Sequence, residues 1–266
     1  MISSLLYNLN HAPLWRREIN VWDRQMRAAS LDRLVALGLH RLGWMGHDEA
    51  ILLRRLVRPG MHAVDVGANI GLYSLLLARL VGRSGSVLAF EPEPNLFAIL
   101  RENCVSNNAT NIVPVQCALS QAKVVASFQR SSFNSGDNRL GPASVGHNAV
   151  EVKVERFDDL QPDSKPDFVK IDVQGHELAA LAGMERALSS NLKVRVLFEF
   201  SPAALRKAGT APDLLLEFFR ERGFELYETE GARLKRLRDS RRLISDLRGR
   251  RYTNLLAARD AVETDD

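Results

Sequence analysis

The chain of 266 residues is long enough for one α/β domain with its own hydrophobic core, and its 45% apolar and 26% charged residues are ordinary for a globular protein. Its two cysteines, Cys104 and Cys117, are too few for a disulfide framework and lack the CxxC spacing or histidine cluster of a zinc site. The net charge is only +4. We therefore expect a soluble protein of a reducing cytoplasm, and a homo-oligomer is compatible with this composition.

The expected elements begin with a helical extension over residues 1–58. Apolar residues such as Leu31, Leu34 and Val35 recur there at helical spacing, and Arg58-Pro59-Gly60 ends the pattern. The main domain is expected over residues 59–260, followed by a disordered tail at 261–266. The longest apolar run, at residues 72–81, contains a charge and is too short for a transmembrane segment.

Short apolar stretches alternate with helical patterns along this main domain. Strands are predicted at 62–66, 86–90, 112–115, 167–171, 194–200, 224–227 and 251–257, and helices at 70–80, 95–105, 176–189 and 212–222. Two β-rich stretches, 123–129 and 150–154, flank a polar loop and predict a β-rich insertion over 121–156. The alternation predicts an α/β fold with a mainly parallel, Rossmann-like sheet whose ligand crevice lies at the carboxyl ends of the strands.

A glycine loop follows the first predicted strand, where this rule places a ligand. Gly67-x-Asn69-x-Gly71 differs in spacing from the GxGxxG loop that holds a pyrophosphate, and it is preceded by Asp65, a poor neighbour for a diphosphate. An acidic residue suits the amino group of S-adenosylmethionine instead. Glu91 ends the second strand about 20 residues beyond the loop, where a carboxylate accepts hydrogen bonds from ribose hydroxyls.

Three segments together resemble the FkbM family of S-adenosylmethionine-dependent methyltransferases. They are Val64-Asp65-Val66-Gly67-Ala68-Asn69-Ile70-Gly71-Leu72-Tyr73-Ser74, Phe90-Glu91-Pro92-Glu93-Pro94 and Lys170-Ile171-Asp172-Val173-Gln174-Gly175-His176-Glu177. The resemblance covers roughly residues 60–200. The sequence departs from the commoner family pattern at Gln174, where an acidic residue often stands, and at His176, where a small residue often does.

The resemblance implies a class I methyltransferase fold, with a seven-stranded sheet whose last strand is antiparallel, and methyl transfer to the oxygen of a sugar, glycolipid or natural-product hydroxyl. It implies that the glycine loop faces the methionine end of the cofactor, that Glu91 faces the ribose and that Ala118 lies at the adenine. The cofactor-binding residues predicted on this basis are Asp65, Gly67, Ala68, Asn69, Gly71, Ser74, Glu91, Pro92, Ala118 and Asp172.

The reacting end is expected around the third segment, at the carboxyl end of the fourth strand. Either Asp172 or His176 would accept the proton of the acceptor hydroxyl, or Asp172 and Glu199 would bind a divalent cation such as magnesium. A helix-capping Asp172 and a structural His176 are the competing interpretations. Lys170 points to the same side of its strand as Asp172, which predicts a salt bridge.

The acceptor itself is expected to be a small molecule or a glycan. The polar loop of the insertion carries Asp137, Asn138 and Arg139, which could hold a polyhydroxylated acceptor together with Glu199, although a solvated loop is nearly as good an interpretation.

Basic residues crowd one late segment of the chain, namely Arg233, Lys235, Arg236, Arg238, Arg241, Arg242, Arg248, Arg250 and Arg251. No aromatic residues interleave for base stacking, so a solvated face is favoured over a nucleic-acid surface. RNA ribose methylation and a non-catalytic nucleotide- or partner-binding module with the same fold stay as alternative functions.

Overall fold

The computed structural model of the chain describes residues 18–21, 24–27, 47–131, 138–141, 147–249 and 251–265. Within this part of the chain, eight strands form the main sheet in the order β13-β12-β14-β11-β10-β3-β4-β5. Their bounds are β3 (His62–Val66), β4 (Ser86–Phe90), β5 (Ile112–Val115), β10 (Phe168–Ile171), β11 (Arg195–Phe200), β12 (Glu225–Glu230), β13 (Arg233–Arg236) and β14 (Thr253–Ala258).

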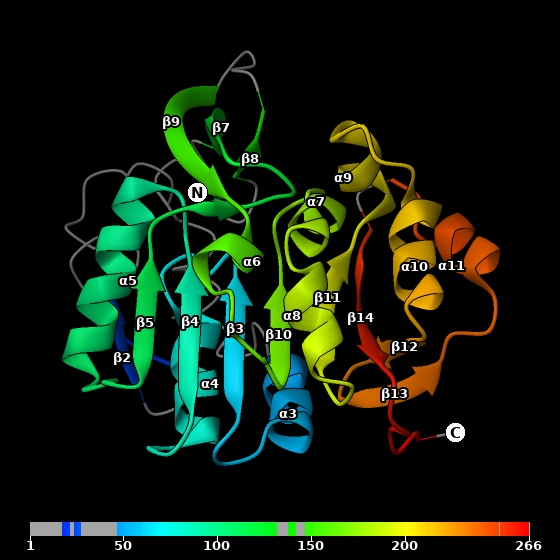
Figure 1. Cartoon of the computed structure of the whole chain (residues 1–266), viewed down its shortest axis with the longest axis horizontal. Helices are drawn as coiled ribbons and strands as arrows, with labels where there is room; N and C mark the ends of the chain where they lie inside the picture. Colours follow the sequence, from blue (N-terminus) through cyan, green and yellow to red (C-terminus); the bar gives the residue numbers. More distant parts are fainter. Residues whose placement is uncertain are drawn as a thin grey trace, which may run out of the picture.

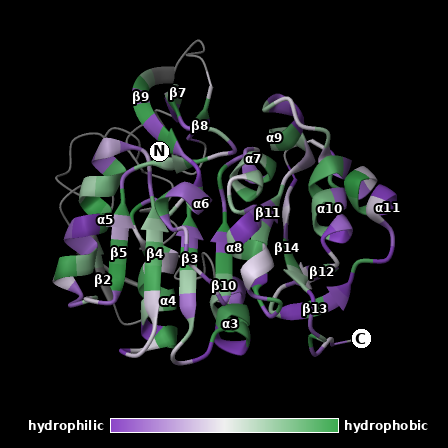
Figure 2. Ribbon diagram, in the orientation of Figure 1, coloured by the Kyte–Doolittle hydropathy of each residue, from purple (hydrophilic) through white to green (hydrophobic). Residues whose placement is uncertain are grey.

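The main sheet is doubly wound, with the directions that the sequence predicts. Strands β5, β4, β3, β10 and β11 pair in parallel, and β14 runs antiparallel to both β11 and β12. The short edge strand β13 is an addition to the seven expected strands and pairs antiparallel with β12. Hydrophobic residues dominate the strands in the middle of the sheet, as expected for strands that are covered on both faces (Figure 2).

Helices cover both faces of this sheet (Figure 1). One hydrophobic core lies under α3 (His47–Leu56), α4 (Leu72–Val81) and α5 (Pro94–Ser106). The other lies under α6 (Phe157–Leu160), α7 (Glu177–Ala182), α8 (Glu185–Ser190), α9 (Pro202–Lys207), α10 (Pro212–Glu221) and α11 (Ser240–Asp246). None of the described helices is long and apolar enough to cross a membrane.

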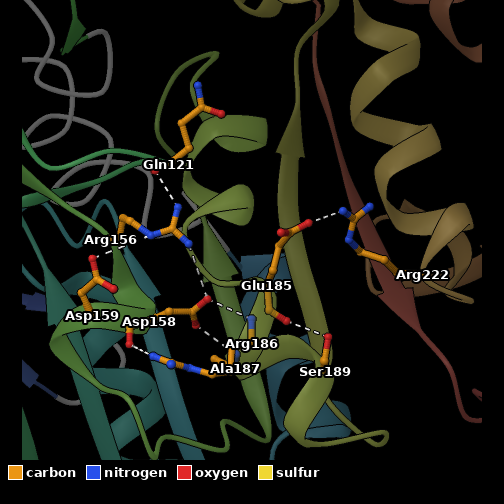
Figure 3. Close-up of polar contacts among 9 residues, drawn as sticks. All are labelled: Gln121, Arg156, Asp158, Asp159, Glu185, Arg186, Ala187, Ser189 and Arg222. Atoms are coloured by element: carbon orange, nitrogen blue, oxygen red, sulfur yellow. Dashed lines mark hydrogen bonds and ion pairs between the residues drawn. The ribbon is translucent and has the colours of Figure 1, made fainter.

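The single helix predicted over 176–189 is divided into α7 and α8 at Gly183. A Cβ atom at Gly183 would lie 2.1 Å from the carbonyl oxygen of Ser120, so the chain passes too close for any side chain. Beyond this point the carboxylate of Asp158 accepts hydrogen bonds from the backbone nitrogens of Arg186 (2.9 Å) and Ala187 (3.0 Å), and so caps the start of α8 (Figure 3). This network is structural.

The β-rich insertion forms a second sheet of its own. Its described strands have the order β6-β9-β7-β8, with bounds β6 (Ala118–Leu119), β7 (Val124–Ser131), β8 (Arg139–Leu140) and β9 (His147–Glu155). Strands β7 and β9 pair antiparallel along their length, and Phe128, Val152 and Val154 form a small core. In Figure 1 this sheet stands at the end of the main sheet toward which the arrows of β3, β4 and β10 point.

Both ends of the described chain differ from the expectation. Strands β1 (Glu18–Val21) and β2 (Arg24–Arg27) form an antiparallel hairpin inside the predicted helical extension, and buried Met26 joins the core beneath α5. At the other end, Asp265 lies in the predicted disordered tail, but its carboxylate accepts hydrogen bonds from Leu234 N (2.9 Å) and Arg55 (3.0 Å). Tertiary contacts therefore override the local pattern at both ends.

Candidate active site

The glycine loop lies between β3 and α4, at the carboxyl end of the sheet. Gly67 (φ 85°), Asn69 (φ 50°) and Gly71 (φ 92°) adopt left-handed backbone conformations, which glycine accepts freely and asparagine more readily than most residues. A Cβ atom at Gly67 would lie 2.0 Å from the carbonyl oxygen of Asp172. The loop therefore packs directly against the segment that follows β10.

Glu91 joins this loop to the next strand. Its Oε2 atom accepts a hydrogen bond from Asn69 N (2.8 Å), and its Oε1 atom accepts one from Glu93 N (2.8 Å). The side chain is buried, and this desolvation raises its pKa to about 8. The first two motifs therefore form one site. The buried Ala68 and Pro92 flank the hydrogen-bonded residues.

Asp65 lies on β3 just below the loop and is fully buried. Its Oδ2 atom accepts a hydrogen bond from Ser74 Oγ (2.6 Å), so the Ser74 hydroxyl is already engaged. Its Oδ1 atom is buried without a hydrogen-bond partner among the described residues. Burial raises the pKa of Asp65, and nearby Lys170 opposes this shift. A buried acceptor without a partner fits the ammonium group of S-adenosylmethionine.

The predicted acceptor end contains a bridge between two carboxyl groups. Gln174, which has a left-handed backbone (φ 52°), donates through Nε2 to Asp172 Oδ1 (3.0 Å) and to Glu199 Oε1 (3.1 Å). Lys170 Nζ lies 3.7 Å from Asp172 Oδ2, which confirms the predicted salt bridge. Burial first, and then the negative charge of Asp172, raise the pKa of Glu199 to about 9. Burial therefore favours the protonated form of Glu199.

The expected divalent-cation site receives no support. Across the described residues, no group of three or more His, Cys, Asp or Glu side chains is placed to hold a metal ion. Asp172 and Glu199 share the amide of Gln174 instead.

His176 precedes α7 and contacts the insertion. The carbonyl oxygen of Leu140 on β8 accepts a hydrogen bond from His176 Nε2 (3.0 Å), and burial lowers the pKa of the imidazole. Only Nδ1 is therefore left as a proton acceptor. The next residue, Glu177, accepts hydrogen bonds through Oε1 from Gly175 N (3.0 Å) and Val173 N (3.3 Å), whereas its Oε2 atom is buried without a described partner.

Several residues of this region were not singled out from the sequence because they come from distant elements. Lys170 Nζ lies 4.3 Å from the centre of the Tyr73 ring on α4. Glu49 Oε1 on α3 accepts a hydrogen bond from Asn254 Nδ2 (3.0 Å) on β14, next to Tyr252. The pairing of β14 with β11 places Asn254 directly opposite Glu199.

The predicted acceptor loop is only partly described. Asp137 lies outside the described residues. Arg139 on β8 donates to Gln129 Oε1 on β7 (3.3 Å), and Asn138 precedes it. Ala118 begins β6 and is buried, so the residue expected at the adenine belongs to the sheet of the insertion.

The chain is similar in sequence to known methyltransferases. The profile of the methyltransferase FkbM domain matches residues 65–226. "Hexuronic acid methyltransferase AglP" of Haloferax volcanii is 33% identical over 130 residues, which cover 47% of this chain and 51% of that protein. "Methyltransferase sdnD" of Sordaria araneosa is 28% identical over 196 residues (61% and 73%), and "31-O-demethyl-FK506 methyltransferase FkbM" of Streptomyces tacrolimicus is 31% identical over 163 (49% and 62%).

A solved structure from Clostridium thermocellum, assigned by name to the rRNA methylases, aligns with a TM-score of 0.52 at 11% identity and covers 82% of this chain and 96% of its own. At that identity the likeness concerns the fold alone. The match to the Haloferax volcanii relative spans about half of that relative's length, 51%. The family profile covers more than half of this chain and includes the glycine loop and the other two motifs. The chain therefore belongs to the FkbM family of S-adenosylmethionine-dependent methyltransferases.

Proposed function

We propose that this protein transfers a methyl group from S-adenosylmethionine to a hydroxyl group of a sugar, a glycolipid or a secondary metabolite. The observation that carries the proposal is the hydrogen bond from Asn69 N to Glu91 Oε2 (2.8 Å), which unites the glycine loop and the ribose carboxylate in one site of an FkbM family member. The relatives named for hexuronic acid and for 31-O-demethyl-FK506 support a hydroxylated acceptor.

The residues of the cofactor side fit this role. Asp65 Oδ1, which lacks a partner among the described residues, would accept from the ammonium group, and Glu91 would accept from the ribose hydroxyls. Ala68, Asn69 and the glycines would lie along the methionine end, with Pro92 and Ala118 toward the adenine. The bound cofactor would supply a methyl group on a positively charged sulfur, so alignment of the acceptor oxygen accounts for much of the rate.

On the acceptor side, Asp172 is the better candidate for the base. Its carboxylate is partly exposed and is held by Gln174 and Lys170, whereas Nε2 of His176 is engaged by Leu140. Glu199, whose protonated form is favoured by burial, would donate a hydrogen bond to an acceptor oxygen instead of removing its proton. Asn138 and Arg139 would contribute from the insertion.

The alternative of RNA methylation gains little from one part of the late basic segment. Arg220, Arg236, Arg238 and Arg241 line a shallow hollow together with Glu225 and Asp239. Glu225 begins β12, and β12 is parallel to β11, so this hollow lies at the edge opposite to the carboxyl ends of the strands. These four arginines are therefore badly placed to hold a nucleic acid at the glycine loop, whereas Arg251 precedes β14, whose first residue Thr253 pairs with Phe200 at the carboxyl end of β11.

Calorimetry tests the cofactor, and mass spectrometry tests the acceptor. We expect the protein to bind S-adenosylmethionine and S-adenosylhomocysteine but not NAD. Incubation with S-adenosylmethionine that carries a deuterated methyl group should label glycans or secondary metabolites of a cell extract. Absence of S-adenosyl binding would overturn the proposal, and label found only in RNA would establish the alternative.

A further inference from the structure

Three side-chain atoms in the described part of the chain are buried without a hydrogen-bond partner: Asp65 Oδ1, Glu177 Oε2 and Arg130 Nε. Buried polar atoms in folded proteins almost always have a partner, so an unsatisfied one marks a place where a ligand or water belongs. Asp65 and Glu177 belong to the site described above. Arg130 differs, because it comes from β7 of the insertion.

Arg130 reaches from the insertion to the turn that carries the ribose carboxylate. Its terminal nitrogen forms an ion pair with Glu93 Oε1, while Glu93 Oε2 accepts from Leu96 N (2.7 Å) and caps α5. The backbone nitrogen of Glu93 donates to Glu91 Oε1 (2.8 Å). Arg130 is thus connected to Glu91 through one residue. Glu93 balances its charge but leaves the Nε–H donor without an acceptor.

The rest of the insertion sheet borders the same end of the site. Ala118, the residue expected at the adenine, begins β6, which pairs with β9, and β9 in turn pairs with β7. On the acceptor side, the carbonyl oxygen of Leu140 on β8 accepts from His176. The second sheet therefore touches the cofactor and acceptor regions at separate points, and the ion pair with Glu93 connects Arg130 to the cofactor region.

We propose that Arg130 is a cofactor-binding residue supplied by the insertion: its Nε–H donates a hydrogen bond to the adenosine half of the cofactor, while Glu93 holds the guanidinium in place. This inference rests on the proposed function, because it requires an S-adenosyl ligand. The planar guanidinium suits the role, since one edge can pair with a carboxylate while Nε points elsewhere.

Two ligands that share the adenosine half distinguish the ends of the site. S-adenosylhomocysteine carries the amino-acid end, and 5′-methylthioadenosine lacks it. We expect Arg130→Met and Arg130→Lys each to weaken the binding of both ligands by about tenfold in calorimetry, the effect of one lost hydrogen bond. Arg130→Lys keeps a positive charge for Glu93 but loses the Nε donor. As a contrast, Asp65→Asn should weaken only S-adenosylhomocysteine.

The matched control is Lys153→Met, which removes an exposed cation from β9 of the same sheet and should bind both ligands like the wild type. Thermal unfolding checks that each variant folds. If Arg130→Met does not fold, the binding measured for Arg130→Lys tests the inference. Wild-type affinity in Arg130→Lys would overturn the inference, and so would a loss confined to S-adenosylhomocysteine. If the wild-type protein bound neither ligand, the proposed function itself would fail.

Discussion

The proposed cofactor side and the proposed acceptor side of this site are built differently. On the cofactor side, backbone nitrogens of short local turns meet one buried carboxylate, as when Asn69 and Glu93 donate to Glu91. On the acceptor side, side chains from α3, α4, β10, β11 and β14 meet, and Gln174 holds two carboxylates together. A site that binds through backbone atoms tolerates few substitutions of its glycines. A site that binds through side chains can change its ligand specificity by single substitutions.

The largest effect should come from the acceptor side. Asp172→Asn should slow methyl transfer by about 100- to 10,000-fold, because the base is lost, and should leave S-adenosylhomocysteine binding nearly unchanged. Steady-state rates and calorimetry measure the two quantities. His176→Asn is the comparison and should have a smaller effect on the rate. An equal or greater loss in that variant would move the role of base to His176.

The backbone character of the cofactor side is tested at Gly67. Gly67→Ala should destabilise the fold by about 3 kcal/mol or more, because its Cβ atom would lie 2.0 Å from the Asp172 carbonyl oxygen in a left-handed conformation. Denaturant unfolding measures this change. Gly82→Ala is the matched control, since Gly82 also has a positive φ (66°) but nothing within 4 Å of the added atom. Equal losses in the two variants would show that the close approach to Asp172 is unimportant.

Glu91 should matter for ligand binding more than for the fold. Glu91→Ala should weaken S-adenosylhomocysteine binding by about 1–3 kcal/mol through lost ribose hydrogen bonds. Calorimetry at neutral pH provides the measurement. Unchanged affinity would remove Glu91 from the site.

The last prediction concerns pH. Burial raises the pKa of Glu199 from 4.5 to about 9, so between these values the folded protein holds a proton that the unfolded chain has lost. The contribution of Glu199 to stability is therefore present at acidic pH and is lost as the pH rises toward 9. The midpoint temperature of unfolding should fall between pH 6 and pH 9 in the wild type, and this fall should be smaller in Glu199→Gln. Glu151→Gln, on the exposed face of β9, should leave the fall unchanged. An unaltered fall in Glu199→Gln would show that this carboxyl group is not buried in solution.

The two sides also differ in how far the sequence predicts them. Asp65, the glycine loop and Glu91 lie within short segments whose spacing reflects one strand-loop-helix unit, so local pattern is sufficient. The parallel strands and antiparallel β14 follow from the alternation and the family resemblance. The neighbours of Glu199 could not be predicted in this way, because Tyr252 and Asn254 approach it only through strand pairing over a long separation in sequence.

Other differences between the predicted and the observed structure also have physical causes. The β1–β2 hairpin contains residues that also suit a helix, and Met26 on β2 is buried against the core beneath α5. The added strand β13 has a polar pattern with one buried residue, Leu234, which is too weak a signal for a strand by itself. The ion pair of Arg130 and Glu93 links two elements that are distant in sequence, and no local sequence pattern predicts this contact.

The insertion has its own small core of Phe128, Val152 and Val154, yet it is joined to the main sheet by Arg130 at Glu93 and by Leu140 at His176. An insertion transferred to another protein would therefore carry residues of both the proposed cofactor site and the proposed acceptor site. Exchange of residues 121–156 between family members should therefore change both the acceptor specificity and the affinity for the cofactor. To separate the two traits, a chimera would have to retain the arginine of β7 while the rest of the second sheet is replaced.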